Sequence, residues 1–191
     1  MTKIVVVGAH HGVGALAVDR LRARGHDVIA FEGDALDEQA VATSLKGVSA
    51  VVSLLGPRKG SPADLCTRGT RHILDAMRVN GVRRLVQVTG AMIGHPRERL
   101  GWIYRFIESR VPAAALADRR EQERLVVESG VAWTLLRPTR LTNGPARGTW
   151  RSAEQERIGA FASISRSDVA EQIAGAIDDD RTIGAKLTLQ Y

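Results

Sequence analysis

Short apolar runs alternate with segments of helical periodicity along the chain. Residues 4–7 form the first run, Ile-Val-Val-Val, which is too short for a helix and is followed at once by Gly8. A run of this kind is typical of a strand buried in a parallel sheet. The next segment places Leu16, Ala17 and Leu21 at helical spacing. The beginning of the chain therefore predicts a strand, a glycine turn and a helix, in that order.

The same alternation continues to the end of the chain. Further strands are predicted at residues 26–31, 48–56, 84–88 and 131–138, with 186–191 as an edge strand. Helices are predicted at about residues 36–45, 63–79, 117–129 and 167–177, and Trp102 and Phe106 have helical spacing within the less regular segment 91–112. This order predicts an α/β fold with a parallel sheet and right-handed crossovers. Because no linker or repeat interrupts it, we expect one domain over residues 1–191.

Three glycines follow the first strand. Gly8, Gly12 and Gly14 have the spacing G-x-x-x-G-x-G. Between a strand and a helix, the first glycine permits a sharp turn, the second lets the backbone approach a pyrophosphate, and the third lets the helix pack closely on the strand. A bound anion would contact the free N–H groups and the positive end of the helix dipole. The loop predicts dinucleotide binding, although a tight turn that binds nothing could have the same spacing.

The composition is that of an ordinary soluble globular protein, with 25% charged and 44% hydrophobic residues among 191. No apolar run approaches the roughly 20 residues that a membrane helix needs, and the N-terminus lacks the pattern of a signal peptide. We therefore expect a cytoplasmic protein without a membrane partner. The single cysteine, Cys66, excludes an internal disulfide, and no Cys/His spacing indicates a metal site.

The net charge of +6 raises the question of a nucleic-acid partner. The 27 basic residues comprise four lysines and 23 arginines, which are spread along the chain and interleaved with acids, as in the RREQER of residues 119–124. No helix-turn-helix, RNA-binding or zinc pattern accompanies them. We therefore expect a small-molecule partner and no nucleic acid. The sequence leaves the choice between a monomer and a homodimer open.

Several stretches together point to a known family. They are GAHHGVG, GDALD with VVSLLG, GVRRLVQVTGAM, DRREQERLVVESGVAWTLLRPTRLTNGP and ISRSDVAEQI. Together they resemble the atypical short-chain dehydrogenase/reductase superfamily, in its NAD(P)H-binding group of NmrA-like regulators and biliverdin/flavin-reductase-like enzymes. The resemblance covers nearly the whole chain and implies a Rossmann-like, doubly wound parallel sheet that binds NADP or NAD. Many members place the middle glycine one residue earlier, where this chain has His11.

The resemblance also implies that the coenzyme contacts the chain where strands end. Open parallel sheets bind ligands beyond the carboxyl ends of their strands, which agrees with this placement. Leu54, Leu55 and Pro138 would serve as walls, and core packing or a turn is the alternative role for them. The implied contacts are Gly8, Ala9, His10, His11, Gly12, Val13, Gly14, Leu54, Leu55, Gly56, Thr89, Gly90, Arg137 and Pro138.

The chain departs from the family pattern after Phe31, where about 15 to 20 residues, an edge strand with its helix, are absent by comparison with usual element lengths. The shortened sheet would have the flavodoxin-like order 2-1-3-4-5. Glu32 and Asp34 stand near the place that reads the adenosine ribose, and an acid there favours NAD. The resemblance instead favours NADP, whose 2′-phosphate Arg58 or Lys59 could reach. The choice stays open, and Asp34 could also N-cap the next helix.

A second departure concerns catalysis. Most short-chain dehydrogenases use Tyr-x-x-x-Lys, where the ammonium lowers the pKa of the phenol. Here the matching helix has Ala115 and Arg119, whereas Tyr104 is followed by Glu108. Arg119 cannot donate a proton at neutral pH, but it could hold a ribose or a substrate anion. With Asp118 and Glu123, it also matches a family DK-x-x-x-E pattern, for which a solvated helix face with an i,i+4 pair is the alternative. The catalytic candidates are Arg119, Tyr104 and His95.

Hydride transfer itself does not need a tyrosine, because the coenzyme carries the chemistry. A flavin, quinone or tetrapyrrole-like acceptor could take its proton from solvent, or from a histidine at position 10, 11 or 95. We expect an NAD(P)-dependent oxidoreductase. The alternatives are a non-catalytic NmrA-like redox sensor and a relative that no longer holds dinucleotide well. An apolar acceptor pocket is expected from Met92, Ile93, Trp102, Tyr104 and Phe106, for which core packing is the alternative.

Overall fold

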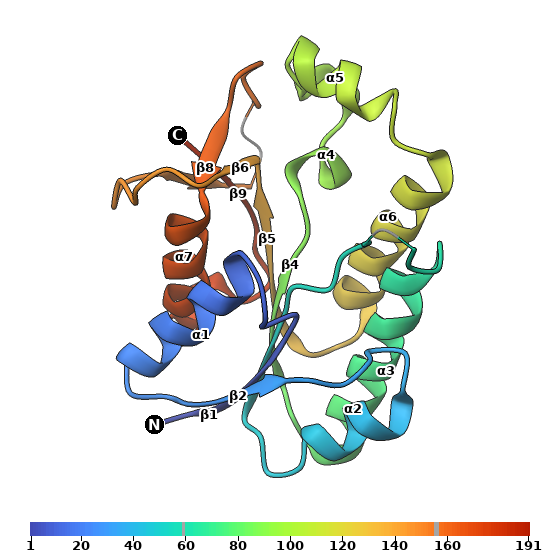
Figure 1. Ribbon diagram of the computed structural model, residues 1–191, viewed down its shortest axis with the longest axis vertical. Coiled ribbons are helices and arrows are strands. Elements are labelled where there is room, and N and C mark those ends of the chain that lie inside the picture. The colour runs from blue at the N-terminus through green and yellow to red at the C-terminus, as the bar shows by residue number, and fades with distance from the viewer. Residues whose placement is uncertain (59, 155–156) are drawn as a thin grey trace.

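A seven-stranded sheet forms the centre of the computed structural model, which describes residues 1–58, 60–154 and 157–191 (Figure 1). The strand order is β2-β1-β3-β4-β5-β9-β7, and the neighbouring strands are parallel up to β9, on which β7 packs antiparallel. The strands are β1 (Lys3–Val7), β2 (Asp27–Phe31), β3 (Ala50–Ser53), β4 (Arg84–Val88), β5 (Ala132–Pro138), β7 (Arg151–Ala153) and β9 (Lys186–Gln190).

Helices cover both faces of the sheet (Figure 1). One face packs against α1 (Val13–Ala23) and α7 (Arg166–Asp178), and the other against α2 (Glu38–Ser44), α3 (Leu65–Asn80) and α6 (Ala113–Glu128). The predicted α/β fold with a doubly wound parallel sheet is confirmed. None of the described helices is long and apolar enough to cross a membrane.

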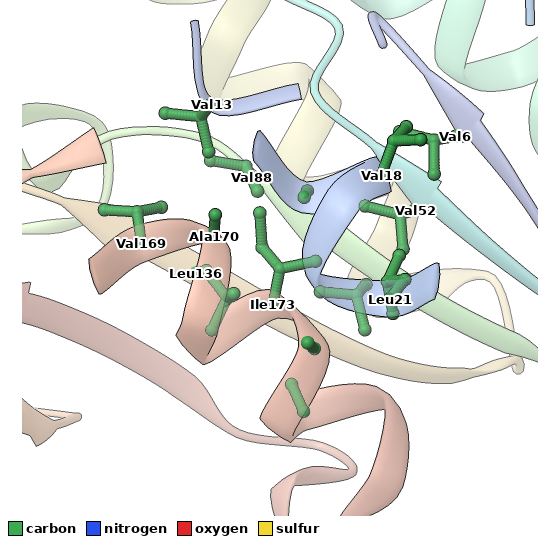
Figure 2. Close-up of a cluster of buried hydrophobic side chains, with 14 of the residues drawn as sticks. Val6, Val13, Val18, Leu21, Val52, Val88, Leu136, Val169, Ala170 and Ile173 are labelled. Carbon is green, nitrogen blue, oxygen red and sulfur yellow. The ribbon is translucent and has the colours of Figure 1, made fainter. Parts of the chain in front are cut away.

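The continuous apolar run of β1 follows from this double coverage. Ile4 and Val6 belong to the hydrophobic core under α1 and α7, whereas Val5 and Val7 belong to the core under α2, α3 and α6. Successive side chains of a strand point to opposite faces, so a strand covered on both sides must be apolar throughout. Figure 2 shows the first core, in which side chains of the strands, α1 and α7 meet.

The order of the first five strands, β2-β1-β3-β4-β5, is the flavodoxin-like order expected for the shortened sheet. After the edge strand β2, the chain passes through α2 and enters the sheet again at β3, on the other side of β1. A single crossover connection from β2 to β3 therefore replaces the two of the longer family pattern, and the shortening leaves the centre of the sheet intact.

The C-terminal strand was expected at an edge, and this expectation is wrong. β9 lies between β5 and β7, and Ser152 of β7 is paired with Leu189. The three residues of β7 carry too weak a pattern to predict. The same holds for β6 (Arg140–Thr142) and β8 (Ser163–Ser165), which form a two-stranded parallel sheet in segments where no element is predicted.

Shorter elements complete the end of the molecule where the parallel strands finish. After β4 come α4 (Ala91–Gly94), the 3-10 turn η1 (Arg97–Arg99) and α5 (Trp102–Glu108). At the opposite end, where the strands begin, η2 (Asp180–Thr182) precedes β9. Figure 1 shows α4 and α5 beyond the end of β4, opposite β6 and β8.

Candidate functional site

The loop between β1 and α1 is shaped by its glycines. Gly8 and Gly12 have φ angles of +84° and +57°, which L side chains rarely adopt. A Cβ atom on Gly14 would lie only 2.0 Å from the carbonyl oxygen of Gly8, so only glycine lets α1 pack this closely on β1. α1 begins without a side-chain cap and without an acidic residue in its first turn. Its amide end is therefore suited to an anion.

Most of the predicted contacts line one cavity of about 340 Å³, here called the inner cavity. It lies at the glycine loop and at the carboxyl ends of β3, β4 and β5. The predicted residues that line it are Gly8, His10, His11, Gly12, Val13, Gly14, Leu54, Gly56, Thr89, Arg119 and Pro138.

A second cavity of about 450 Å³, here called the edge cavity, lies at the end of β2. Glu32, Asp34 and Leu55 line it, and it shares Gly8, His10 and Arg58 with the inner cavity. The two cavities therefore adjoin each other at the glycine loop. The shortening of the chain after β2 has left a cavity at the position predicted for the adenosine.

Two side chains hold the wall of the edge cavity. Nε2 of His10 lies 3.1 Å from the carbonyl oxygen of Phe31, which links the glycine loop to the end of β2. Oδ1 of Asp34 accepts from the amide of Leu36 at 2.9 Å. The N-cap of α2 is Asp37, so the suggested capping role of Asp34 is wrong, and this carboxylate fixes the preceding turn instead. Lys59 lies outside the described residues.

Glu123 and Arg137 form a buried ion pair behind the inner cavity. Nε of Arg137 donates to Oε1 of Glu123 at 3.0 Å, and its Nη2 donates to the other carboxylate oxygen. The hydroxyl of Thr89 donates to the same Oε1 at 2.5 Å. Glu123 is only 7% exposed, so the alternative of a solvated helix face is wrong at this position. The Thr89 hydroxyl hydrogen is engaged in the bond to Glu123, so its oxygen can only accept a hydrogen bond from a group in the cavity.

The neighbouring residues of α6 are also engaged. The Asp118 carboxylate accepts from the amides of Cys66 at 3.0 Å and Thr67 at 2.8 Å, and so caps the first turn of α3. Burial opposes its ionisation, but these hydrogen bonds together keep the pKa of Asp118 below its ordinary value. Nη1 of Arg119 donates to the Leu55 carbonyl at 2.7 Å, which holds the guanidinium at the end of β3. Arg119 can attract an anion there but offers no proton.

Two other catalytic candidates lie outside both cavities. The Tyr104 hydroxyl donates to the carbonyl of Ala162 at 2.6 Å and accepts from the amide of Arg140 at 2.8 Å, and burial raises its pKa. His95 is buried, with its ring nitrogens 3.0 Å from the Ala91 carbonyl and 3.0 Å from the Thr188 hydroxyl. Both side chains hold neighbouring elements together and do not face the glycine loop.

In the described part of the chain, none of the five residues expected to form an apolar acceptor pocket, Ile93 included, lines the inner or the edge cavity. Trp102 and Phe106 are 61% and 54% exposed, because the outer face of α5 is not covered by the described residues. Met92 and Tyr104 pack in a small core cluster, as the alternative had it, and neither lines the two cavities. Three implied contacts, Ala9, Gly90 and Arg137, also lie outside both cavities.

The structure adds two arginines to the inner cavity. The sequence suggests Arg58 only as a ligand of a 2′-phosphate, but it lines both cavities at their junction. Arg166, at the start of α7, was not predicted at all, although it belongs to the ISRSD stretch that carries the family resemblance. That stretch is the signal that could have found it.

Comparison with known proteins identifies the group to which this architecture belongs. Residues 30–180 match the model of the NAD(P)H-binding family. The chain is 25% identical over 166 residues to the uncharacterized sugar epimerase YhfK of Bacillus subtilis (strain 168), covering 85% of this chain and 72% of YhfK. It is 31% identical over 179 residues to a 3-diazoavenalumate denitrifying reductase of a Streptomyces species, covering 76% of this chain but only 58% of that reductase.

A solved structure confirms the fold over nearly the full length of both chains. ChuY of Escherichia coli O157:H7, described as an anaerobilin reductase, superposes with a TM-score of 0.75 and 20% identity, covering 98% of this chain and 96% of ChuY. The family model, the relatives and the fold agree with the resemblance seen in the sequence. The chain belongs to the NAD(P)H-binding family, and its coenzyme is NADP or NAD.

Proposed function

We propose that the protein is an NAD(P)-dependent oxidoreductase that transfers a hydride to a small conjugated acceptor of the flavin, quinone or tetrapyrrole type. The observation that carries the proposal is the pair of adjoining cavities that meet at the glycine loop. The names of two similar proteins, the Streptomyces reductase and ChuY, support a reductase. The name of YhfK, a sugar epimerase, supports only the broader class of coenzyme-dependent enzymes.

The two cavities fit the two halves of the coenzyme. The loop amides and the uncapped end of α1 would hold the pyrophosphate, where Gly12 has no side chain to block its approach. Glu32 in the edge cavity would face the adenosine ribose. Thr89 and Pro138 would border the nicotinamide in the inner cavity. This assignment agrees with the rule that ligands bind beyond the carboxyl ends of parallel strands.

The reduced coenzyme supplies the hydride when it is bound, and the chain binds, orients and shields. Because the Thr89 hydroxyl donates to Glu123, its oxygen can accept a hydrogen bond from a group such as a carboxamide. The proton that balances the reduction would come from solvent or from His10 or His11, which line the inner cavity. Tyr104 and His95 are bound to other parts of the fold and are not available there.

One observation favours a second candidate function. The aromatic residues expected to bind an acceptor are on the surface or in a separate core cluster. An NmrA-like sensor, which binds NAD(P) and signals to a protein without turnover, would not need an acceptor pocket. The two candidates share the coenzyme site and differ only in turnover.

A titration separates the two functions. NADH and NADPH are added separately, with and without FMN, menadione or biliverdin, while nicotinamide absorbance reports oxidation and nicotinamide fluorescence reports binding. Oxidation above a control without protein supports the reductase, and Thr89→Val should lower it, whereas exposed Thr43→Val, on α2, should not. Tight binding without oxidation by any acceptor would support the sensor. If neither coenzyme binds, both functions are wrong.

A further inference from the structure

Arg166 lies over the glycine loop although it comes from the other end of the chain. A Cβ atom on Gly12 would lie 3.5 Å from Nε and 3.7 Å from Cδ of Arg166. Gly12 directly precedes α1 and Arg166 begins α7, and these two helices pack side by side, as Figure 2 shows for Leu21 of α1 and Ile173 of α7. Arg166 therefore reaches the part of the inner cavity where α1 begins.

One polar partner holds the Arg166 side chain in this position. Its Nη1 donates to Oδ1 of Asn143 at 2.6 Å. A guanidinium has five N–H donors, so this bond uses a small part of its capacity. No carboxylate of the described residues forms an ion pair with Arg166, and no described acidic side chain lines the inner cavity.

The backbone under Arg166 is fixed by Asp168, which is 1% exposed. Its carboxylate accepts from the amides of Arg147 at 2.9 Å and Gly148 at 3.1 Å and from the hydroxyl of Ser165 at 2.9 Å. The Tyr191 hydroxyl donates to the same carboxylate. These bonds tie the loop after β6, the first turn of α7 and the C-terminus together. The backbone position of Arg166 is thus set by these bonds, and the Asn143 amide oxygen holds its side chain.

We propose that Arg166 is a ligand of the coenzyme pyrophosphate, which it binds together with the loop amides, and that Asn143 orients it. The inference rests on the proposed coenzyme site in the inner cavity. The loop and the end of α1 offer neutral amide groups, whereas a pyrophosphate is an anion. The Arg166 guanidinium adds a positive charge beside Gly12, and its fork of N–H groups matches phosphate oxygens. This role concerns Arg166 alone, because Ser165 and Asp168 of the same stretch hold the first turn of α7.

The test is direct binding, which needs no acceptor and no turnover. Dissociation constants of NADH, NADPH and ADP-ribose are measured by calorimetry for the wild-type protein, Arg166→Ala and Arg166→Lys. Arg166→Ala should weaken the binding of all three by about 10- to 100-fold, because a charge-assisted hydrogen bond is lost. The dissociation constants of Arg166→Lys should lie between those of the wild-type protein and Arg166→Ala, since an ammonium keeps the charge but lacks the fork of N–H groups. ADP-ribose lacks the nicotinamide. Weaker binding of ADP-ribose by Arg166→Ala would therefore assign the effect to the part of the coenzyme that contains the adenosine and the pyrophosphate.

A matched control is Arg20→Ala. Arg20 also joins α1 to α7, through the Ser167 hydroxyl at 3.3 Å, but it is absent from the lining of the inner cavity. Its replacement should leave the three dissociation constants unchanged. If Arg166→Ala failed to fold, as circular dichroism would show, Arg166→Lys would still carry the test.

Each opposite result overturns the inference in a recognisable way. Unchanged binding by Arg166→Ala, with a wild-type protein that binds, would remove Arg166 from the site and leave the proposed function intact. Tighter binding by Arg166→Ala would show that the side chain blocks the site. If the wild-type protein bound none of the three ligands, the coenzyme site and this inference would fail together.

Discussion

The carboxylate of Glu123 shows how single residues behind the site depend on one another. It is buried, and a charge in that position needs partners, which Arg137 and Thr89 supply. Arg137 in turn needs Gly94, because a Cβ atom there would lie 1.9 Å from its Cζ. The orientation of the Thr89 hydroxyl group thus depends on Glu123, Arg137 and Gly94, none of which lines the inner cavity.

His95 is the residue from which we predict a pH dependence of stability. Burial is the main cause that lowers its pKa, and the charge of Arg137 adds to it. The unfolded chain takes up this proton near pH 6.5, whereas the folded protein resists it. Stability is therefore complete above that pH and falls below it, by up to about 1.4 kcal/mol per pH unit for one proton.

Unfolding in urea at pH 7.5 and at pH 5.5 measures this effect. His95→Gln should lose less free energy of unfolding between the two pH values than the wild-type protein, because glutamine does not titrate. Exposed His11→Gln is the control and should keep the wild-type difference. Equal pH differences in His95→Gln and the wild-type protein would contradict the prediction.

At the scale of elements, the contact of α1 with β1 depends on Gly14. A methyl group at this position would meet the Gly8 carbonyl, so α1 would have to move away from the strand. Gly14→Ala should destabilise the protein by about 1–3 kcal/mol, as overpacking does, and should weaken coenzyme binding. Gly175→Ala, within α7, is the control, because a Cβ atom there meets nothing within 4 Å. It should stabilise the protein by about 0.5–1 kcal/mol.

Thermal unfolding of both glycine variants and coenzyme titration would check this prediction. Both changes add one methyl group to a helix. Changes of opposite sign in the free energy of unfolding would therefore separate the effect of packing at the loop from that of helix propensity. A Gly14→Ala protein as stable as the wild type would show that α1 can shift without cost.

Elements with a strong local pattern could be predicted from the sequence. The strand β4 has the predicted bounds, residues 84–88, because its apolar residues Leu85, Val86 and Val88 are buried in the sheet. Elements whose position depends on a distant partner could not. Nothing in residues 186–191 shows that β7 will cover their outer side. Likewise, the helical spacing of Trp102 and Phe106 marks a face of α5 but not what lies against it.

The same distinction holds for the candidate site. Residues placed by strand ends, such as Thr89 and Pro138, could be located because parallel strands finish at one edge. The roles of Arg166 and Glu123 depend on how far a side chain reaches between elements, and no local pattern contains that information. For Arg166 the sequence offered a family motif but no partner.

At the scale of the whole molecule, charge is distributed unevenly along the two cavities. Arg58, Arg119 and Arg166 line the inner cavity, whereas the edge cavity has the acids Glu32 and Asp34 beside Arg58. An anionic pyrophosphate suits the first environment. The second environment has acids and a base together at the position that we propose for the adenosine ribose, where NAD and NADP differ because only NADP has a 2′-phosphate.

Glu32 and Arg58 should therefore shift the coenzyme preference in opposite directions. Glu32→Gln removes a charge that repels the 2′-phosphate and binds ribose hydroxyls, so the ratio of the dissociation constants for NADPH and NADH should fall by about tenfold. Arg58→Gln should raise the same ratio. Asp27→Asn is the control, because Asp27 is exposed at the opposite end of the same strand. A ratio that Glu32→Gln leaves unchanged, or a fall with Arg58→Gln, would show that the adenosine ribose does not lie in the edge cavity.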